Sequence, residues 1–409
     1  MKMIKRFRFM TCALSMAAIL VAVPPAHAQK KYDTGATDTS IKIGNLMPYS
    51  GPASAYSVIG KVEEAYFKMV NEKGGINGRK IEFVTYDDAY SPPKTAEQAR
   101  RLVESDEVLL LFSTLGAPTN SAIHRYMNTK KVPQLFVASG STKWGDPKNF
   151  PWTMGAWPSY QSEGRIYAKY ILDTKPNAKI AILYQNDDFG KDVLKGLKDG
   201  LGEKTSLIVA EASYETSDPV IDSQIIKLKT SGADVFVNLS TPKFAAQSIR
   251  KVAEIQWQPM HIVSAISNSV GSVIKPAGFD NAKGVISAQF LKDPSDPVWK
   301  ADAGLKELNT FLDKYYPEAD RANSLVGYGY VNAQMMFQTL KQAGDNLTRD
   351  NIMKQAASLK NMELPMLLPG IKVNTAADDF NPIEQMQLMR FNGEHWELFG
   401  PVIEGAVRN

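Results

Sequence analysis

The sequence predicts an α/β protein made of two similar lobes, each a doubly wound parallel sheet with helices on both faces. Strand-like runs alternate with helical runs of 10–15 residues, which is the pattern of parallel sheets. The alternation restarts beyond residue 160, so two successive sets are expected. The chain has 409 residues, 44% hydrophobic and 22% charged, which is an ordinary globular composition with the length for two domains.

The first set begins with a strand over 41–46. Apolar residues at helical spacing predict a helix over 58–72, and the glycine-rich turn over 74–78 ends it. The set continues with strands over 80–87, 108–113 and 133–138, and with helices over 94–105 and 119–128.

The second set repeats this order, and helices follow it. Its helices are expected over 161–173, 190–201, 220–231 and 243–254, and its strands over 179–184, 205–212, 234–239 and 260–264. Later helices are predicted over 299–315, about 322–343 and 348–359. Two strands, 384–391 and 395–399, flank Asn392-Gly393, which predicts a hairpin.

The first 28 residues have the pattern of a cleavable export signal. A basic head over 2–8 precedes an apolar run over 10–23, and Ala26 and Ala28 supply the small residues that a signal peptidase requires. A membrane anchor is the alternative, but a bilayer span needs roughly 20 apolar residues, which is more than this run contains. We expect cleavage after Ala28 and a periplasmic mature protein.

Removal of this signal changes the charge and the cysteine content. The chain has 47 Lys and Arg against 43 Asp and Glu, and the signal contains four basic residues and no acidic one, so the mature chain has no net formal charge. The basicity that would favour nucleic-acid binding is therefore lost. Cys12, the one cysteine, lies too early in the apolar run for a lipoprotein, so neither a disulfide nor a thiolate site is expected.

Patterns typical of catalysis or metal binding are not found. His124, His261 and His395 do not have metal-ligand spacing, and the sequence contains no Gly-x-Ser-x-Gly elbow and no phosphate-binding Walker loop. We expect no enzyme, no cofactor and no metal.

A ligand is expected in the cleft between the lobes, because parallel sheets bind ligands beyond the carboxyl ends of their strands. Loop 113–119 runs from a strand into a helix, where Gly116 and Ala117 allow close approach to free N–H groups that suit a carboxylate. A simple N-cap at Thr119 is the alternative. The other loops that follow strands are 47–57, 87–93, 139–144, 185–190, 213–219, 240–243 and 264–270.

Four stretches resemble the branched-chain amino-acid-binding family of periplasmic receptors, in order and in spacing. They are residues 51–56, 71–78, 187–190 and 293–297. The resemblance extends over nearly all of the mature chain. It implies a type I periplasmic-binding fold, with two lobes joined by three crossings, that delivers its ligand to the membrane permease of an ABC importer. The implied lobes are 38–158 plus about 292–368, and 159–291 plus about 369–403.

The resemblance also implies site residues. Tyr56 falls at the family's aromatic position, the loops at Gly116 and Gly140 hold the ligand's carboxylate, and Phe189 stands where the family often has tyrosine. We expect Trp144 and Trp157 to serve lobe packing. The ligand-binding candidates are Tyr56, Gly116, Ala117, Ser139, Gly140, Thr142, Tyr160, Phe189, Thr216 and Ser217.

The sequence departs from the family where amino-acid binders pair the ligand's ammonium. The acidic stretch 215–219 is shifted by a two-residue insertion, and Phe189 lacks a polar group. Since an unpaired buried ammonium is costly, these departures favour an aromatic acid, with a hydrophobic amino acid left open.

The predicted function is capture of a small carboxylate for an ABC importer by a monomer that closes around it and binds no nucleic acid. A ligand sensor for a membrane signalling partner and, less favoured, a periplasmic hydrolase are the alternatives.

Overall fold

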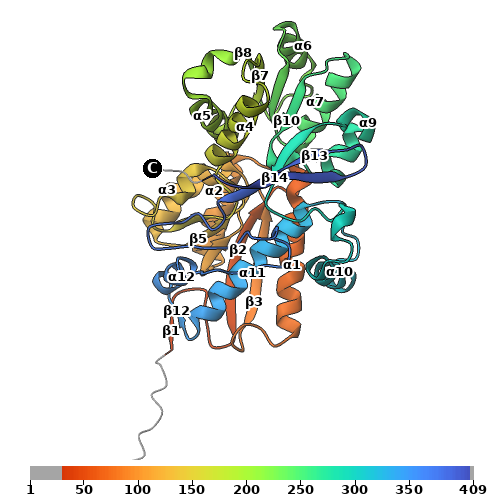
Figure 1. Ribbon diagram of the computed structural model, residues 1–409. Coiled ribbons are helices and arrows are strands. Elements are labelled where there is room, and N and C mark those ends of the chain that lie inside the picture. The colour runs from red at the N-terminus through yellow and green to blue at the C-terminus, as the bar shows by residue number, and fades with distance from the viewer. Residues whose placement is uncertain (1–29, 406–409) are drawn as a thin grey trace, which may run out of the picture.

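The computed structural model describes residues 30–405, which form two sheets, each with its own helices, one above the other in Figure 1. The predicted signal over 1–28, with its cleavage point and Cys12, lies outside the described residues. The predicted α/β class with two lobes is confirmed.

The first sheet is entirely parallel, with the strand order β3-β2-β4-β5-β6. The strands of this sheet are β2 (Ser40–Met47), β3 (Lys80–Asp87), β4 (Leu110–Phe112), β5 (Gln134–Val137) and β6 (Thr153–Gly155). The helices between them are α1 (Ser57–Glu72), α2 (Pro92–Arg100) and α3 (Ala117–Lys130). Ile41 and Ile43 of β2 are fully buried, so the alternating apolar pattern of this strand supplies core contacts.

The second sheet has the order β14-β13-β11-β10-β9-β7-β8, and only its last two strands in the chain are antiparallel. Its strands are β7 (Ile180–Gln185), β8 (Ile208–Tyr214), β9 (Val235–Leu239), β10 (Met260–Val263), β11 (Ile286–Gln289), β13 (Gln385–Phe391) and β14 (Trp396–Glu404). Its helices are α4 (Tyr160–Thr174), α5 (Asp188–Leu201), α6 (Asp222–Thr230), α7 (Pro242–Glu254), α8 (Lys275–Ala277) and α9 (Phe279–Ala282). The hairpin predicted around Asn392-Gly393 is confirmed.

The chain crosses between the sheets three times. It leaves the first sheet after β6, returns after β11 and leaves again after α12 (Arg349–Ala356). The returning segment carries α10 (Ala303–Tyr315) and α11 (Leu325–Ala343). Asn332 of α11 donates to the Ser113 Oγ (2.7 Å) and to the Phe136 carbonyl (3.2 Å), so this late helix packs on the first sheet. The three crossings predicted from the resemblance are confirmed.

Several predicted boundaries are wrong. The strand expected over 205–212 starts at Ile208, because Gly202, with a φ of 54°, ends α5 and residues Gly202–Leu207 form a tight turn of helix. The helix expected over 299–315 begins at Ala303, where Asp302 accepts a hydrogen bond from the Leu305 N–H and caps it. Strands β6 and β11 were not expected from the sequence.

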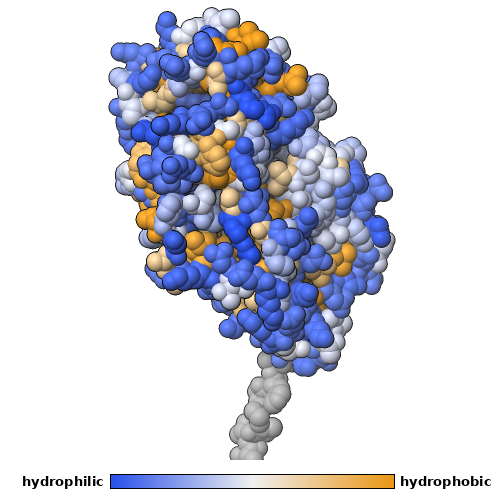
Figure 2. Space-filling model, turned by 90° about the vertical axis from the view of Figure 1, so that its right-hand side faces the viewer, coloured by the Kyte–Doolittle hydropathy of each residue, from blue (hydrophilic) through white to orange (hydrophobic). Residues whose placement is uncertain are grey.

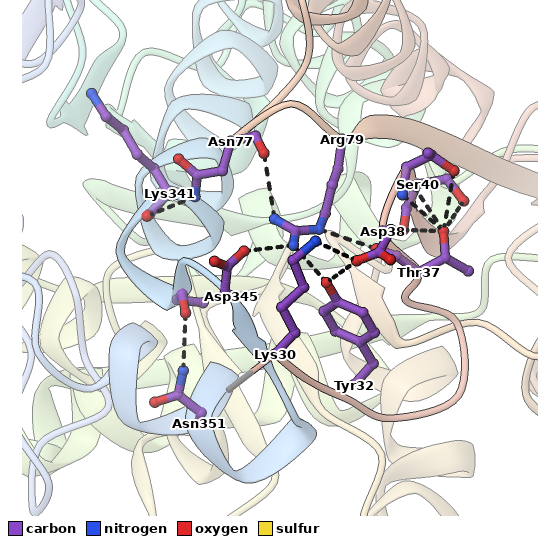
Figure 3. Close-up of polar contacts among 12 residues, drawn as sticks. Lys30, Tyr32, Thr37, Asp38, Ser40, Asn77, Arg79, Lys341, Asp345 and Asn351 are labelled. Atoms are coloured by element: carbon purple, nitrogen blue, oxygen red, sulfur yellow. Dashed lines mark hydrogen bonds and ion pairs between the residues drawn. The ribbon is translucent and has the colours of Figure 1, made fainter. Parts of the chain in front are cut away.

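The N-terminal described segment is held at the end of the first lobe away from the second sheet (Figure 1). Strand β1 (Lys31–Tyr32) pairs in parallel with β12 (Asn346–Leu347). The Arg79 guanidinium joins the two segments by donating to the Tyr32 hydroxyl (2.7 Å) and to Asp345 (2.6 Å) (Figure 3). Arg79 is almost fully buried, so these bonds compensate a charge that has lost most of its water.

The surface in Figure 2 is mostly hydrophilic, and its apolar residues form several small patches. Among residues 30–405 no helix combines the length and the apolar character needed to cross a membrane.

Candidate ligand-binding site

A narrow cavity lies between the two sheets, and we call it the inner cavity. Its volume is about 30 Å³, which is room for roughly one water molecule. None of the described side chains that line it is charged, and five of them are aromatic rings. The lining residues are Tyr56, Ile59, Tyr90, Leu115, Gly116, Ala138, Ser139, Trp157, Tyr160, Thr241, Ile266, Leu325 and Tyr328.

The loops that follow the strands of the first sheet build the near wall. Tyr56 ends the short turn after β2, Tyr90 follows β3, Gly116 follows β4 and Ser139 follows β5. Because these strands are parallel, their carboxyl ends meet at one edge and bring the four residues together.

Gly116 occupies a position that only glycine fits. Its φ is 98°, and a Cβ there would lie 2.5 Å from the Tyr90 ring and 2.6 Å from the Thr119 Oγ1. Helix α3 begins at the next residue, Ala117. The first-turn N–H groups of a helix have no partner within it and form the positive end of its dipole. This turn can therefore receive an anionic oxygen.

Gly140 and Phe189 support the wall without lining it. A Cβ on Gly140 would lie 2.3 Å from the Pro158 carbonyl and 2.7 Å from the Tyr160 ring, so its small size lets Tyr160 reach the cavity. Phe189 is buried and meets the Tyr160 ring edge-on, with 5.0 Å between the centroids.

A neutral hydrogen-bond network backs the far wall. The Thr241 Oγ1 and the Tyr214 hydroxyl both donate to the Gln185 Oε1, each at 2.9 Å. Asp187 lies nearby but caps α5, where it accepts from the Phe189 and Gly190 N–H groups. Its carboxylate is thus already used inside the protein.

The tyrosine hydroxyls of the cavity stay uncharged. Burial raises the pKa of Tyr56, Tyr90, Tyr160 and Tyr328 well above the ordinary value of 10. Each hydroxyl is therefore a neutral donor or acceptor at physiological pH.

Polar contacts hold the two lobes together around the cavity. The Tyr56 hydroxyl donates to the Ile266 carbonyl at 3.2 Å. Asp188 of α5 accepts from the Ser121 hydroxyl of α3 at 2.5 Å and from the Lys143 ammonium at 2.6 Å. Burial raises the pKa of the Asp188 carboxyl, but these bonds outweigh burial and leave it below its usual value.

The Asp188 contacts lie in an open, charged groove beside the cavity, which we call the outer groove. The Thr142 N–H donates to Asp192 there at 2.7 Å. The groove is lined by Ser141, Thr142, Lys143, Gly145, Asp146, Pro147, Lys148, Asn149, Gln161, Asp188, Lys191, Asp192, Lys195, Ala377 and Asp378.

The predicted residues therefore fall in different places. Those that line the inner cavity are Tyr56, Gly116, Ser139 and Tyr160, whereas Ala117, Gly140 and Phe189 adjoin it. Thr142 lies in the outer groove, and Thr216 and Ser217 lie in a further open groove beside Gly51 and Lys243.

Sequence reasoning missed part of the lining. Tyr90, Thr241 and Ile266 lie in loops that follow strands and were therefore expected to face the cleft. Nothing in the sequence of those loops distinguished these three residues from their neighbours as ligand contacts. Leu325 and Tyr328 belong to α11. The packing role expected for Trp157 is incomplete, because Trp157 also lines the cavity, whereas Trp144 packs against His124 with 4.9 Å between ring centroids.

The described residues contain no group of three or more His, Cys, Asp or Glu placed to hold a metal ion.

Comparison with known proteins agrees with this architecture. The chain is similar to "Leu/Ile/Val-binding protein homolog 7" of Brucella suis biovar 1 (strain 1330), with 28% identity over 353 residues that cover 81% of each chain. It also resembles the structure of a fatty acid ABC transporter substrate-binding protein from Thermomonospora curvata (21% identity, TM-score 0.78, covering 92% of this chain and 95% of that one). A solute-binding protein from R. palustris in complex with benzoate superposes similarly (18% identity, TM-score 0.74, 89% and 98%).

The model of the periplasmic binding protein family matches residues 40–395, which is most of the chain. The family predicted from the four short stretches is confirmed, and so is its fold of two parallel-sheet lobes joined by three crossings. The chain belongs to the periplasmic binding protein family.

Proposed function

We propose that this protein is the periplasmic solute receptor of an ABC importer and that it captures a small carboxylate in the inner cavity without transforming it. The observation that carries the proposal is the cavity itself, which is enclosed by the strand-end loops of two lobes and lined by uncharged, largely aromatic side chains.

The start of α3 supports a carboxylate. Gly116 lines the cavity directly before the helix, Ala117 is the first residue of that helix, and Ser139 also lines the cavity. Helix N-termini favour anions. The ligands named for the similar proteins, namely Leu/Ile/Val, a fatty acid and benzoate, are all carboxylic acids.

The rest of the lining supports a ligand without an ammonium group. A buried ammonium needs a charged partner, and the lining that the structure describes offers none. Asp187, the acid behind the far wall, is engaged in capping α5. We favour flat aromatic acids over amino acids, because the rings of Tyr56, Tyr90 and Tyr160 can stack on them once the lobes part to admit a ligand.

Capture would occur by hinged closure about the three crossings. A ligand shifts the lobes toward the closed form only through its greater affinity for that form. Contacts such as Tyr56 to Ile266 would break when the lobes part, and the closed surface is what the permease would recognise. The receptor would act as a monomer, after cleavage of the signal behind Ala28.

The test is a thermal-shift screen of the mature protein against amino acids, aromatic acids and short aliphatic acids. Ligands that bind the folded state raise the melting temperature. We expect aromatic acids to give the largest shifts, with stoichiometric binding by calorimetry and the ligand recovered unchanged. Shifts from amino acids alone would contradict the aromatic-acid proposal, and turnover of the ligand would contradict the receptor function.

A further inference from the structure

Two buried hydrogen-bond donors in the wall of the inner cavity have no partner among the described residues. Tyr328 is 2% exposed and its hydroxyl is unpaired, and Trp157 is 8% exposed and its indole N–H is unpaired. Both residues line the cavity. Buried polar groups are nearly always hydrogen-bonded in folded proteins, so two exceptions in one cavity require an explanation.

Three other polar side chains of the wall have partners within the protein. The Tyr56 hydroxyl donates to the Ile266 carbonyl, and the Thr241 Oγ1 donates to Gln185. The Tyr90 hydroxyl accepts a longer bond from the Gln185 Nε2 at 3.5 Å. These groups therefore have hydrogen-bond partners within the protein, whereas the Trp157 N–H and the Tyr328 hydroxyl have none among the described residues.

The two open donors are neighbours in space although they are far apart in the chain. Trp157 lies on the first crossing between the sheets, and Tyr328 lies in α11. Their ring centroids are 4.9 Å apart, and the Phe290 ring packs against Trp157 from the second crossing between the sheets, also at 4.9 Å. This packing restrains both rings and keeps them side by side.

The chemistry of the pair defines what it can bind. An indole N–H can only donate, and the Tyr328 hydroxyl stays protonated because burial raises its pKa. The complementary group on a ligand must therefore be an acceptor. Gly116 and Ser139, the residues proposed to hold the carboxylate, lie on other segments of the chain. Trp157 and Tyr328 therefore offer a second group of hydrogen-bond donors, separate from the proposed carboxylate site.

We propose that Trp157 and Tyr328 donate hydrogen bonds to an oxygen acceptor on the part of the ligand outside its carboxylate. The protein then selects carboxylic acids that also carry a hydroxyl, ether or carbonyl oxygen, over acids with a purely hydrocarbon body. This inference rests on the proposed capture of a carboxylate and specifies its substrate class further.

The test compares benzoate with the three monohydroxybenzoates by isothermal titration calorimetry on the full mature protein, Tyr328→Phe and Trp157→Phe. We expect the wild type to bind at least one hydroxylated isomer about 10-fold more tightly than benzoate, since one or two added hydrogen bonds give this order of preference. Tyr328→Phe removes one oxygen and keeps the ring, so the ratio of the hydroxybenzoate affinity to the benzoate affinity should fall to about twofold or less.

Tyr330→Phe is the matched control on the same helix. Its hydroxyl donates to Glu307 at 2.7 Å and lies outside the cavity lining, so the ligand preference should not change. Binding of benzoate and its hydroxylated forms with equal affinity, or a preference that survives in both Tyr328→Phe and Trp157→Phe, would overturn the inference and leave the proposed function intact. Binding of no carboxylate by the wild type would contradict the proposed function itself.

Discussion

The inner cavity and the outer groove lie side by side between the same two lobes, yet they differ sharply in charge. The cavity is narrow and its described lining is uncharged, whereas the groove is open and its lining includes four lysines and four aspartates. We infer from this difference that ligand recognition and lobe closure are separated in this protein. Under the proposed function, the cavity would select the ligand, and the groove would contribute to how long the lobes stay closed around any ligand.

The largest expected effect comes from the cavity. Gly116→Ala places a Cβ against Tyr90 and Thr119 at a φ of 98°, so we expect an affinity loss on the order of 100-fold from strain and displaced rings. Calorimetry with the best ligand from the screen measures it.

Gly74→Ala is the matched control for this substitution. Its φ of 101° imposes similar backbone strain, but a Cβ there meets nothing within 4 Å. Its affinity should therefore remain normal. Equal losses in the two variants would mean that strain on the fold, and not the cavity, governs binding.

An intermediate effect is expected in the outer groove. Asp188→Asn weakens the contacts with Ser121 and Lys143, which are partly exposed and therefore modest in energy. We expect an affinity loss of about 3- to 5-fold that is the same for every ligand and is measured as faster dissociation in stopped-flow experiments.

Raising the salt concentration should also speed ligand dissociation from the wild-type protein, since salt screens exposed ion pairs. Asp173→Asn, which breaks an exposed pair with Lys169 in α4, is the control and should leave dissociation unchanged. A change of ligand preference in Asp188→Asn would refute the separation of the two regions.

The smallest expected effect is that of pH. Because the pKa of Asp188 is lowered, its contribution to the contacts between the lobes is complete above the ordinary pKa of 3.8 and is lost only in stronger acid. The cavity tyrosines titrate well above 10. Benzoate affinity should therefore change by less than about twofold between pH 6 and 8.5, since carboxylic acids stay ionised there. A tenfold change in calorimetry would reveal a titrating group, such as Asp187, in contact with the ligand.

Most of the fold could be predicted because strands and helices of ordinary length leave a periodic pattern. Strands β6 (Thr153–Gly155) and β11 (Ile286–Gln289) were missed because they lack the run of large apolar residues that marks the equally short strands β4 and β10. The predicted start of β8 was wrong because Gly202 ends α5 with a positive φ and the residues after it form a tight helical turn. Hydrophobic periodicity contains no information about this backbone conformation.

The lining of the inner cavity could be predicted where local rules apply. Gly116 and Ser139 follow parallel strands directly, and loops in that position face the cleft in such sheets. Tyr328 was not predictable in the same way, because α11 returns to the cavity only through the second crossing. Its apolar surroundings in the sequence indicate a core helix and not a ligand contact.

The two ends of the described chain differ in their use for attaching a probe. Arg79 fastens the segment after Lys30 at the end of the first lobe away from the second sheet, whereas Gly405 lies against Ser162 at the start of α4, beside the crossings (Figures 1 and 3). An immobilising tag placed before Lys30 would hold the molecule without obstructing either lobe. A fluorophore placed at residue 405 would sit where the lobes pivot, so its emission would report closure and make the protein an optical sensor of its own ligand.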